Sequence, residues 1–205
     1  MPTINIKLTN YNFNIPKGKN IVVLANYRTG STALCKLLSN ITGYINLDED
    51  FHRTTSTRGR FKNTQGPSIV KIMPDQIPGI RVIDELFDNA FVIGLYRRNF
   101  PAQVVSWITC IKTNQWHSEL GRMVSIPKDL KICPADIETH ALHIYQCYLD
   151  YVECGEYMDT EMCYEELLPD LHLSGNIKTP RVDEYQQQID LVKSMLPLLK
   201  IPYYE

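Results

Sequence analysis

Short apolar runs recur along the chain, and polar, turn-forming stretches separate them. The runs that predict strands are Asn20–Ala25, Ser68–Met73, Ala90–Tyr96 and Thr160–Tyr164. The first three are almost continuously apolar, which is typical of strands covered on both faces, as in parallel sheets.

Between and after these runs, apolar residues recur at helical spacing. The predicted helices are Ser31–Ile41, Pro74–Asp88, Phe100–Ile111, Ile137–Val152 and Tyr185–Leu199. Strands that alternate with helices predict βαβ units. We therefore expect a three-layer α/β/α fold with a central, mainly parallel sheet of the P-loop-like kind. Ligands of such sheets bind at the carboxyl ends of the strands.

Composition limits the number of domains and the kinds of partner. The chain has 205 residues, of which 44% are hydrophobic and 21% charged, so we expect one globular domain spanning residues 1–205. A net charge of −2 and a pI near 6.2 argue against a nucleic-acid partner, because nucleic-acid-binding domains are usually basic. Any phosphate or sulfate site must therefore be local.

The sequence shows no sign of a membrane segment or a metal motif. No apolar run is long enough to cross a bilayer, and Met1–Asn20 lacks the apolar core of a secretory signal. We expect a soluble, cytoplasmic protein without a membrane partner. The cysteines form no CxxC pair and show no zinc-finger spacing, so we expect small buried side chains and no metal. They are Cys35, Cys110, Cys133, Cys147, Cys154 and Cys163.

Two stretches predict long loops, His52–Pro67 and Gly121–Pro134. Loops of this length in compact domains are usually lids, binding loops or disordered segments. The first carries Arg53, Arg58, Arg60 and Lys62 and no acid. It is either a lid over an anionic substrate or a solvated surface loop.

The segment after the first apolar strand predicts an anion site. Leu24–Thr32 reads LANYRTGST and leads from a strand into a helix. The free N–H groups and the dipole of a helix N-terminus favour an anion there, and Gly30 allows close approach of the backbone. Against the pattern GxxxxGK[ST], the lysine position holds Ser31, and the loop carries its cation at Arg28. It suits a shorter, less charged anion than a triphosphate, or else the segment is a capped helix start with a solvent-facing arginine.

A second candidate anion element follows the most apolar strand. Arg97, Arg98 and Asn99 come at the strand end, and Ser106 lies eight residues after Arg98, inside the next predicted helix. Arginine at a strand end and serine two helical turns on can meet the same phosphate.

These motifs together resemble the sulfotransferase family. That family carries a [KR]-[ST]-G-[ST]-[ST] loop for the 5′-phosphosulfate, matched here by Arg28, Thr29, Gly30, Ser31 and Thr32. Its arginine and serine for the 3′-phosphate are matched by Arg98 and Ser106. A third match is Tyr164-Glu165-Glu166-Leu167, after the family's late strand. The matches occur in the family's order and span most of the chain.

The sequence also departs from the family pattern. Small-molecule sulfotransferases carry Lys-Thr-His before the second phosphate element, and this chain has Lys71-Ile72-Met73, without the histidine. The C-terminal glycine-rich segment is not recognisable, although Ser174–Arg181 could replace it. The chain looks closer to the short bacterial and carbohydrate-type branches, in which a carboxylate is the base. Glu49 is the candidate base here, with Asp48, Asp50 and His52 as rivals.

The resemblance implies sulfuryl transfer from 3′-phosphoadenosine 5′-phosphosulfate (PAPS) to a hydroxyl or amine of a small molecule or carbohydrate, without a metal. It leaves 3′,5′-adenosine bisphosphate (PAP) as product. Arg28 and Lys71 would contact the transferring group, Gly30–Thr32 the 5′-phosphate, and Arg98 with Ser106 the 3′-phosphate. Two alternatives stay open: a P-loop kinase or nucleotidase, and a non-catalytic domain that binds a nucleotide or anion.

Overall fold

The computed structural model describes residues 2–48, 65–77, 87–114, 130–173 and 185–202. Its strands are β1 (Thr3–Lys7), β2 (Asn12–Pro16), β3 (Asn20–Ala25), β4 (Ile45–Asn46), β5 (Ser68–Ile72), β6 (Ala90–Tyr96) and β7 (Thr160–Cys163). Its helices are α1 (Ser31–Thr42), α4 (Phe100–Thr113), α5 (Pro134–Glu153), α6 (Tyr164–Leu173) and α7 (Gln186–Met195), with 3₁₀ turns η2 (Pro74–Gln76) and η3 (Cys154–Tyr157).

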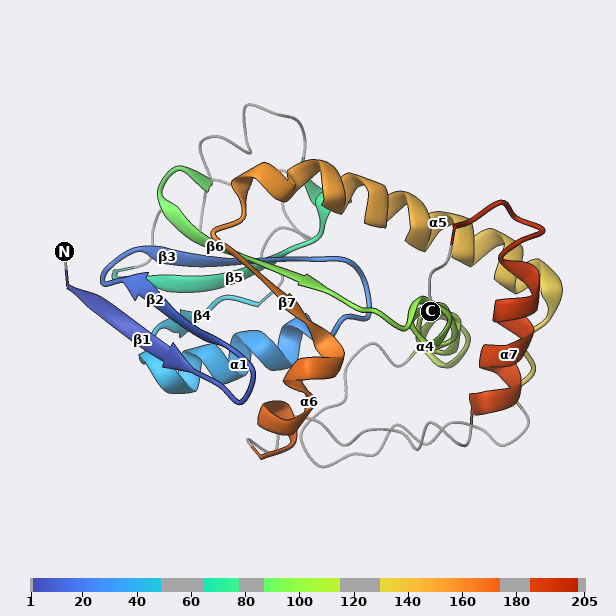
Figure 1. The fold of residues 1–205 in the computed structure, drawn as a ribbon, viewed down its shortest axis with the longest axis horizontal. Coiled ribbons are helices and arrows are strands. Elements are labelled where there is room, and N and C mark those ends of the chain that lie inside the picture. The colour runs from blue at the N-terminus through green and yellow to red at the C-terminus, as the bar shows by residue number, and fades with distance from the viewer. Residues whose placement is uncertain (1, 49–64, 78–86, 115–129, 174–184, 203–205) are drawn as a thin grey trace.

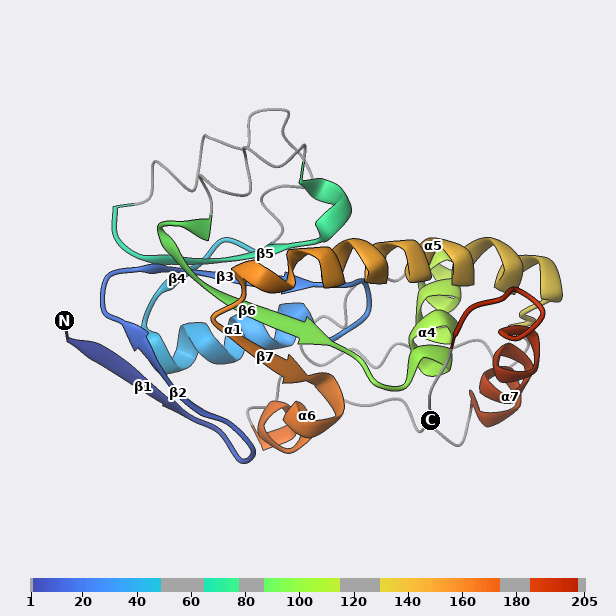
Figure 2. The ribbon, with the colours of Figure 1, turned by 45° about the horizontal axis from the view of Figure 1, so that its top comes forward.

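The centre of the fold is a parallel sheet of five strands in the order β4-β5-β3-β6-β7. Helices α1 and α6 cover one face, and α5 runs along the other (Figures 1 and 2). This arrangement confirms the predicted α/β fold, with a parallel sheet between two helix layers.

The apolar runs explain why the central strands are buried on both faces. Successive side chains of a strand point to opposite faces. In β3, Ile21 and Val23 belong to the core on the α1 side, whereas Val22 and Leu24 belong to the core that includes Tyr151 of α5. All four are fully buried. A third cluster joins α4, α5 and α7 beyond the carboxyl ends of the strands.

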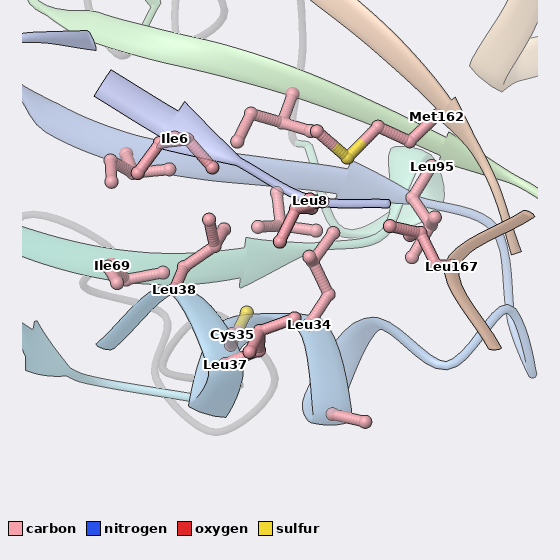
Figure 3. Packing of buried hydrophobic residues seen from close by; sticks show 14 of the residues in the cluster. Ile6, Leu8, Leu34, Cys35, Leu37, Leu38, Ile69, Leu95, Met162 and Leu167 are labelled. Atoms are coloured by element: carbon pink, nitrogen blue, oxygen red, sulfur yellow. The ribbon is translucent and has the colours of Figure 1, made fainter. Parts of the chain in front are cut away.

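A hairpin of β1 and β2, which sequence reasoning did not predict, packs on the α1 side of the sheet. Figure 3 shows Ile6 and Leu8 of this N-terminal segment beside Leu34 and Leu38 of α1. Most other side chains of the hairpin are exposed or half-buried, and Ile15 is the one fully buried side chain of β2. Because so few of its side chains are buried, the hairpin has only a weak periodic pattern of apolar residues in the sequence.

The other differences concern element ends and one extra helix. The described part of the predicted helix Pro74–Asp88 begins with the turn η2, and residues 78–86 lie outside the described residues. Helix α6, not predicted, follows β7 directly and contains Pro169. Among the described helices, none combines the length and apolar character needed to cross a membrane.

Candidate functional site

The candidate site lies where the parallel strands end. The loop Asn26–Gly30 leaves β3, Arg97–Asn99 leave β6, and Asp48 follows β4. Strand β3 lies between β5 and β6. The chain continues from β3 to β4 and β5 on one side of it, and then crosses to β6 and β7 on the other side. That arrangement is the topological switch point at which parallel α/β sheets bind ligands.

The loop after β3 is fixed by hydrogen bonds from its own residues and from two helices. Thr29 donates from Oγ1 to the carbonyl of Asn26 over 2.8 Å, and the Asn26 amide donates to the carbonyl of Ile144 in α5 over 3.1 Å. Gln103 of α4 donates to the carbonyl of Tyr27 over 2.6 Å. Asn26, Thr29 and Gln103 are buried. The loop therefore has a preorganised shape.

Two residues of this loop have left-handed backbone conformations. Arg28 has φ of 60° and Gly30 has φ of 79°. At Gly30 there is also no room for a side chain, because a Cβ atom would lie 2.5 Å from Cε2 of Tyr164. The close approach of the Tyr164 ring and the positive φ together require glycine.

The N-terminus of α1 lacks a side-chain cap among the described residues. Gly30 is the N-cap, no side chain among the described residues caps it, and the first turn contains no acidic residue. The first intrahelical hydrogen bonds run from Ala33 and Leu34 to the Gly30 carbonyl, so the N–H groups of Ser31 and Thr32 precede them. Helix α4 differs, because its N-cap Asn99 accepts the N–H of Ala102 over 3.0 Å.

Lys71 brings a buried cation to the first turn of α1. It shares the α1 side of β5 with Ile69, two residues earlier, and only 2% of its side chain is exposed. Its Nζ donates to Oγ1 of Thr32 over 2.7 Å and lies 3.5 Å from Oδ1 of Asp48. Because the ammonium occupies a lone pair of the Thr32 hydroxyl, this hydroxyl can offer its proton to an anion.

Arg28 and Ser106 form a second pair of the same kind. The Nε of Arg28 donates to Oγ of Ser106 over 3.1 Å, so the loop after β3 meets helix α4. The Ser106 hydroxyl accepts from a cation and keeps its own proton for another acceptor.

The two consecutive arginines after β6 have different surroundings. Arg98 is exposed, and its Nη2 donates to Oε1 of Glu166 over 2.6 Å, a hydrogen bond that raises the pKa of Arg98. Arg97 is mostly buried, which lowers its pKa. Its Nη1 donates to the carbonyl of Arg28 over 3.3 Å, and its Cζ lies 4.9 Å from the centroid of the Tyr164 ring. Arg97 thus supports the loop after β3 through the Arg28 carbonyl, whereas Arg98 points to Glu166.

Glu165 holds the turn between β6 and α4. Its carboxylate accepts the N–H of Arg98 over 3.0 Å and that of Asn99 over 3.1 Å, and it lies 3.6 Å from Nε of Arg97. Burial opposes ionisation of Glu165, but these backbone hydrogen bonds outweigh burial and lower its pKa. The third sequence match therefore lies against the second anion element.

The structure thus brings Arg28, Thr32, Lys71 and Ser106 together around the start of α1, with Asp48 beside Lys71. Arg98 instead contacts Glu166, and both side chains are exposed. Glu49, Asp50, His52 and residues 174–181 lie outside the described residues. Sequence reasoning placed Arg97 only among the strand-end arginines that could hold a phosphate, and it assigned no role to the Tyr164 ring. The doubled arginine and the aromatic residue before two acids were the available signals.

Comparisons with known proteins find similar solved structures but no matching sequence or family model. No protein-family model matches the chain, and no curated protein sequence matches it. Among solved structures, it is similar to mouse sulfotransferase SULT7A1 complexed with PAP, at 10% sequence identity and a TM-score of 0.49, covering 95% of this chain and 73% of that one. At that identity and TM-score the likeness does not identify an activity.

Proposed function

We propose that the protein is a sulfotransferase that moves a sulfuryl group from PAPS to an acceptor hydroxyl or amine. Residues 1–205 form a single domain in this proposal. The observation that best supports it is a pair of cation–hydroxyl contacts beside the uncapped N-terminus of α1. They join Lys71 to Thr32 and Arg28 to Ser106.

This arrangement suits a phosphosulfate better than a triphosphate. The helix N–H groups and the Thr32 hydroxyl offer several neutral donors to the 5′-phosphate. The helix position at which nucleoside triphosphatases carry their lysine holds Ser31, and the cations approach from Arg28 and Lys71 instead. Two cations can neutralise the charge that develops on the bridging oxygen, so the reaction needs no metal ion.

The proposed reaction is an in-line displacement at sulfur. The acceptor oxygen or nitrogen forms a bond to sulfur while the bond from sulfur to the 5′-phosphate oxygen breaks, and PAP leaves with that electron pair. Arg28 and Lys71 stabilise the bridging and transferring oxygens, and Gly30, Ser31 and Thr32 hold the 5′-phosphate. Thr29 belongs to the same donor-binding loop and fixes its shape through Asn26. The chain's main contribution is to position charge, as in phosphoryl transfer.

A carboxylate accepts the acceptor's proton in this proposal. Glu49 remains the first candidate, with Asp50 and His52 as neighbouring alternatives. Asp48 is supported as a rival by its position, because its Oδ1 lies 3.5 Å from Nζ of Lys71 and its side chain is about half exposed. A base next to the Lys71 cation would lie close to the transferring group.

Arg98 and Ser106 are assigned to the 3′-phosphate. Arg98 keeps guanidinium N–H groups besides the one at Nη2 that Glu166 accepts. Its exposure allows it to reorient toward a phosphate, and Ser106 is already turned toward Arg28. We place the protein in the cytoplasm, and a carbohydrate is the acceptor class that the sequence resemblance favours.

A turnover assay tests the proposal. Purified protein is incubated with PAPS and a panel of sugars, phenols and amines, and PAP formation is followed for the wild type and Lys71→Met. Acceptor-dependent PAP formation that falls strongly in Lys71→Met supports the proposal. ATP turnover that requires magnesium, without PAPS turnover, would favour the kinase alternative. PAP binding with no turnover on any acceptor would favour the non-catalytic binding domain.

A further inference from the structure

Three potential metal ligands meet on the α5 side of the sheet, outside the proposed donor site. His143 and Cys147 are four residues apart on α5, so they share one helix face. Asp75 belongs to the turn η2, which packs against α5. One donor atom from each of the three side chains lies within 4.8 Å of the other two.

The donor set is one that a thiophilic divalent cation prefers. Zinc takes thiolate, imidazole and carboxylate ligands, and zinc sites with three protein ligands leave a fourth position open. The Sγ of Cys147 lies 4.0 Å from Nε2 of His143, and tetrahedral zinc would hold these atoms about 3.5 Å apart. For this pair, a small side-chain rotation reaches the tetrahedral separation.

The surroundings orient two of the three ligands. Tyr27 donates its hydroxyl to Oδ2 of Asp75 over 2.8 Å, the kind of outer hydrogen bond that orients metal-bound carboxylates. His143 packs against the adjacent rings of Tyr27 and Trp107, with ring centroids 5.7 Å and 5.5 Å away. Cys147 is buried, whereas Asp75 and His143 are exposed, so a cation would be reached from the solvent side.

A buried thiol becomes a thiolate ligand when a cation replaces its proton. Sequence reasoning predicted no metal here, because the ligands come from a helical spacing and from a distant turn rather than from a CxxC motif.

We propose that Asp75, His143 and Cys147 bind one divalent cation of the zinc class. On binding, Cys147 releases its thiol proton to solvent, and the carboxylate and neutral imidazole complete three protein ligands. The cation would tie η2 to α5 and fix the Tyr27 ring, whose residue precedes Arg28 in the anion loop. The site is independent of the proposed sulfuryl transfer, since none of its ligands takes part in that reaction.

Cobalt is the probe that tests this site in the full chain. Co²⁺ bound by a thiolate gives a charge-transfer band in the near ultraviolet, and tetrahedral coordination gives intense visible bands. We expect one Co²⁺ per chain with both signatures, displaced by Zn²⁺. Cys147→Ser should abolish the charge-transfer band, and His143→Gln or Asp75→Asn should weaken binding by at least about ten-fold.

Matched variants exclude other cysteines and histidines. Cys154→Ser removes the next buried thiol after Cys147, Cys133→Ser removes an exposed one, and His140→Gln changes a neighbouring histidine of α5. All three should keep the spectrum. Circular dichroism checks that each variant folds, and His143→Gln, at an exposed position, keeps the test valid if Cys147→Ser does not. A spectrum that survives Cys147→Ser, binding unchanged in His143→Gln, or no stoichiometric Co²⁺ binding by the wild type would overturn the proposal.

Discussion

The ammonium of Lys71 lies 2.7 Å from the hydroxyl of Thr32, so a cation carried by a central strand reaches the first turn of α1. Lysine is rarely buried to this extent unless it has partners. Thr32 and the Asp48 carboxylate supply them. The sheet thereby holds one cation in a fixed position beside a helix N-terminus, where a developing negative charge can be stabilised without reorganisation.

Lys71→Met should separate chemistry from donor binding. The thioether is close in length to the lysine stem and leaves the buried strand apolar, so we expect a folded protein. PAPS turnover should fall by roughly 10²–10³-fold, as when one preorganised donor to a developing charge is lost. PAP affinity, measured by calorimetry, should change much less. Turnover equal to the wild type would exclude Lys71 from the reaction.

Arg28→Gly should lose affinity without losing stability. The left-handed backbone at Arg28 costs roughly 1–2 kcal/mol for an L-residue, and glycine removes this cost while adding roughly 0.5–1 kcal/mol of backbone entropy. The free energy of unfolding should therefore stay nearly constant. Without the guanidinium, PAP affinity should fall about ten-fold or more. Arg28→Ala, which keeps the strain, should be less stable than Arg28→Gly in urea unfolding and equally weak in binding.

Gly30→Ala and Gly43→Ala should differ in stability. Gly30 begins and Gly43 ends the same helix, with φ of 79° and 73°. Alanine at either position meets the left-handed penalty, roughly 1–2 kcal/mol. At Gly43 nothing lies within 4 Å of the added Cβ, whereas at Gly30 it meets the Tyr164 ring. Urea unfolding should show that Gly30→Ala is less stable than Gly43→Ala by about 1–3 kcal/mol. Equal losses would mean that the ring yields without cost.

Acid should weaken the turn that Glu165 holds. The pKa of Glu165 in the folded protein is below its ordinary value of 4.5, because backbone N–H groups outweigh burial. A lowered pKa contributes stability that is fully present above pH 4.5 and is lost as the pH falls through the folded value. The difference in unfolding free energy between the wild type and Glu165→Gln should therefore shrink as the pH falls below 4.5. A difference independent of pH in that range would contradict this assignment.

The sheet could be predicted from sequence because its strands are covered on both faces. The predicted strands Asn20–Ala25 and Ala90–Tyr96 match β3 and β6 at both ends. A short, continuous apolar run is typical of a strand buried on both faces. The hairpin could not, because few of its side chains are fully buried. Helix α6 was missed because it begins with no break after β7 and contains a proline.

The position of the candidate anion loop could also be predicted, but not the different contacts of the neighbouring residues Arg97 and Arg98. A strand followed by Arg28, Gly30 and a helix is a local signal, and the loop lies where that signal puts it. Which of Arg97 and Arg98 faces the loop depends on Glu165 and Glu166, far along the chain. Tertiary packing decides which arginine faces the loop, and local sequence patterns do not predict tertiary packing.

Titration of the protein with PAP in a calorimeter tests the central claim most directly. The wild type is compared with Arg98→Ala, Ser106→Ala and the exposed control Lys131→Ala, and each is also titrated with ATP and magnesium. We expect micromolar binding of PAP that is weakened in the first two variants and unchanged in Lys131→Ala, with no binding of ATP. Clear binding of ATP with none of PAP would contradict it.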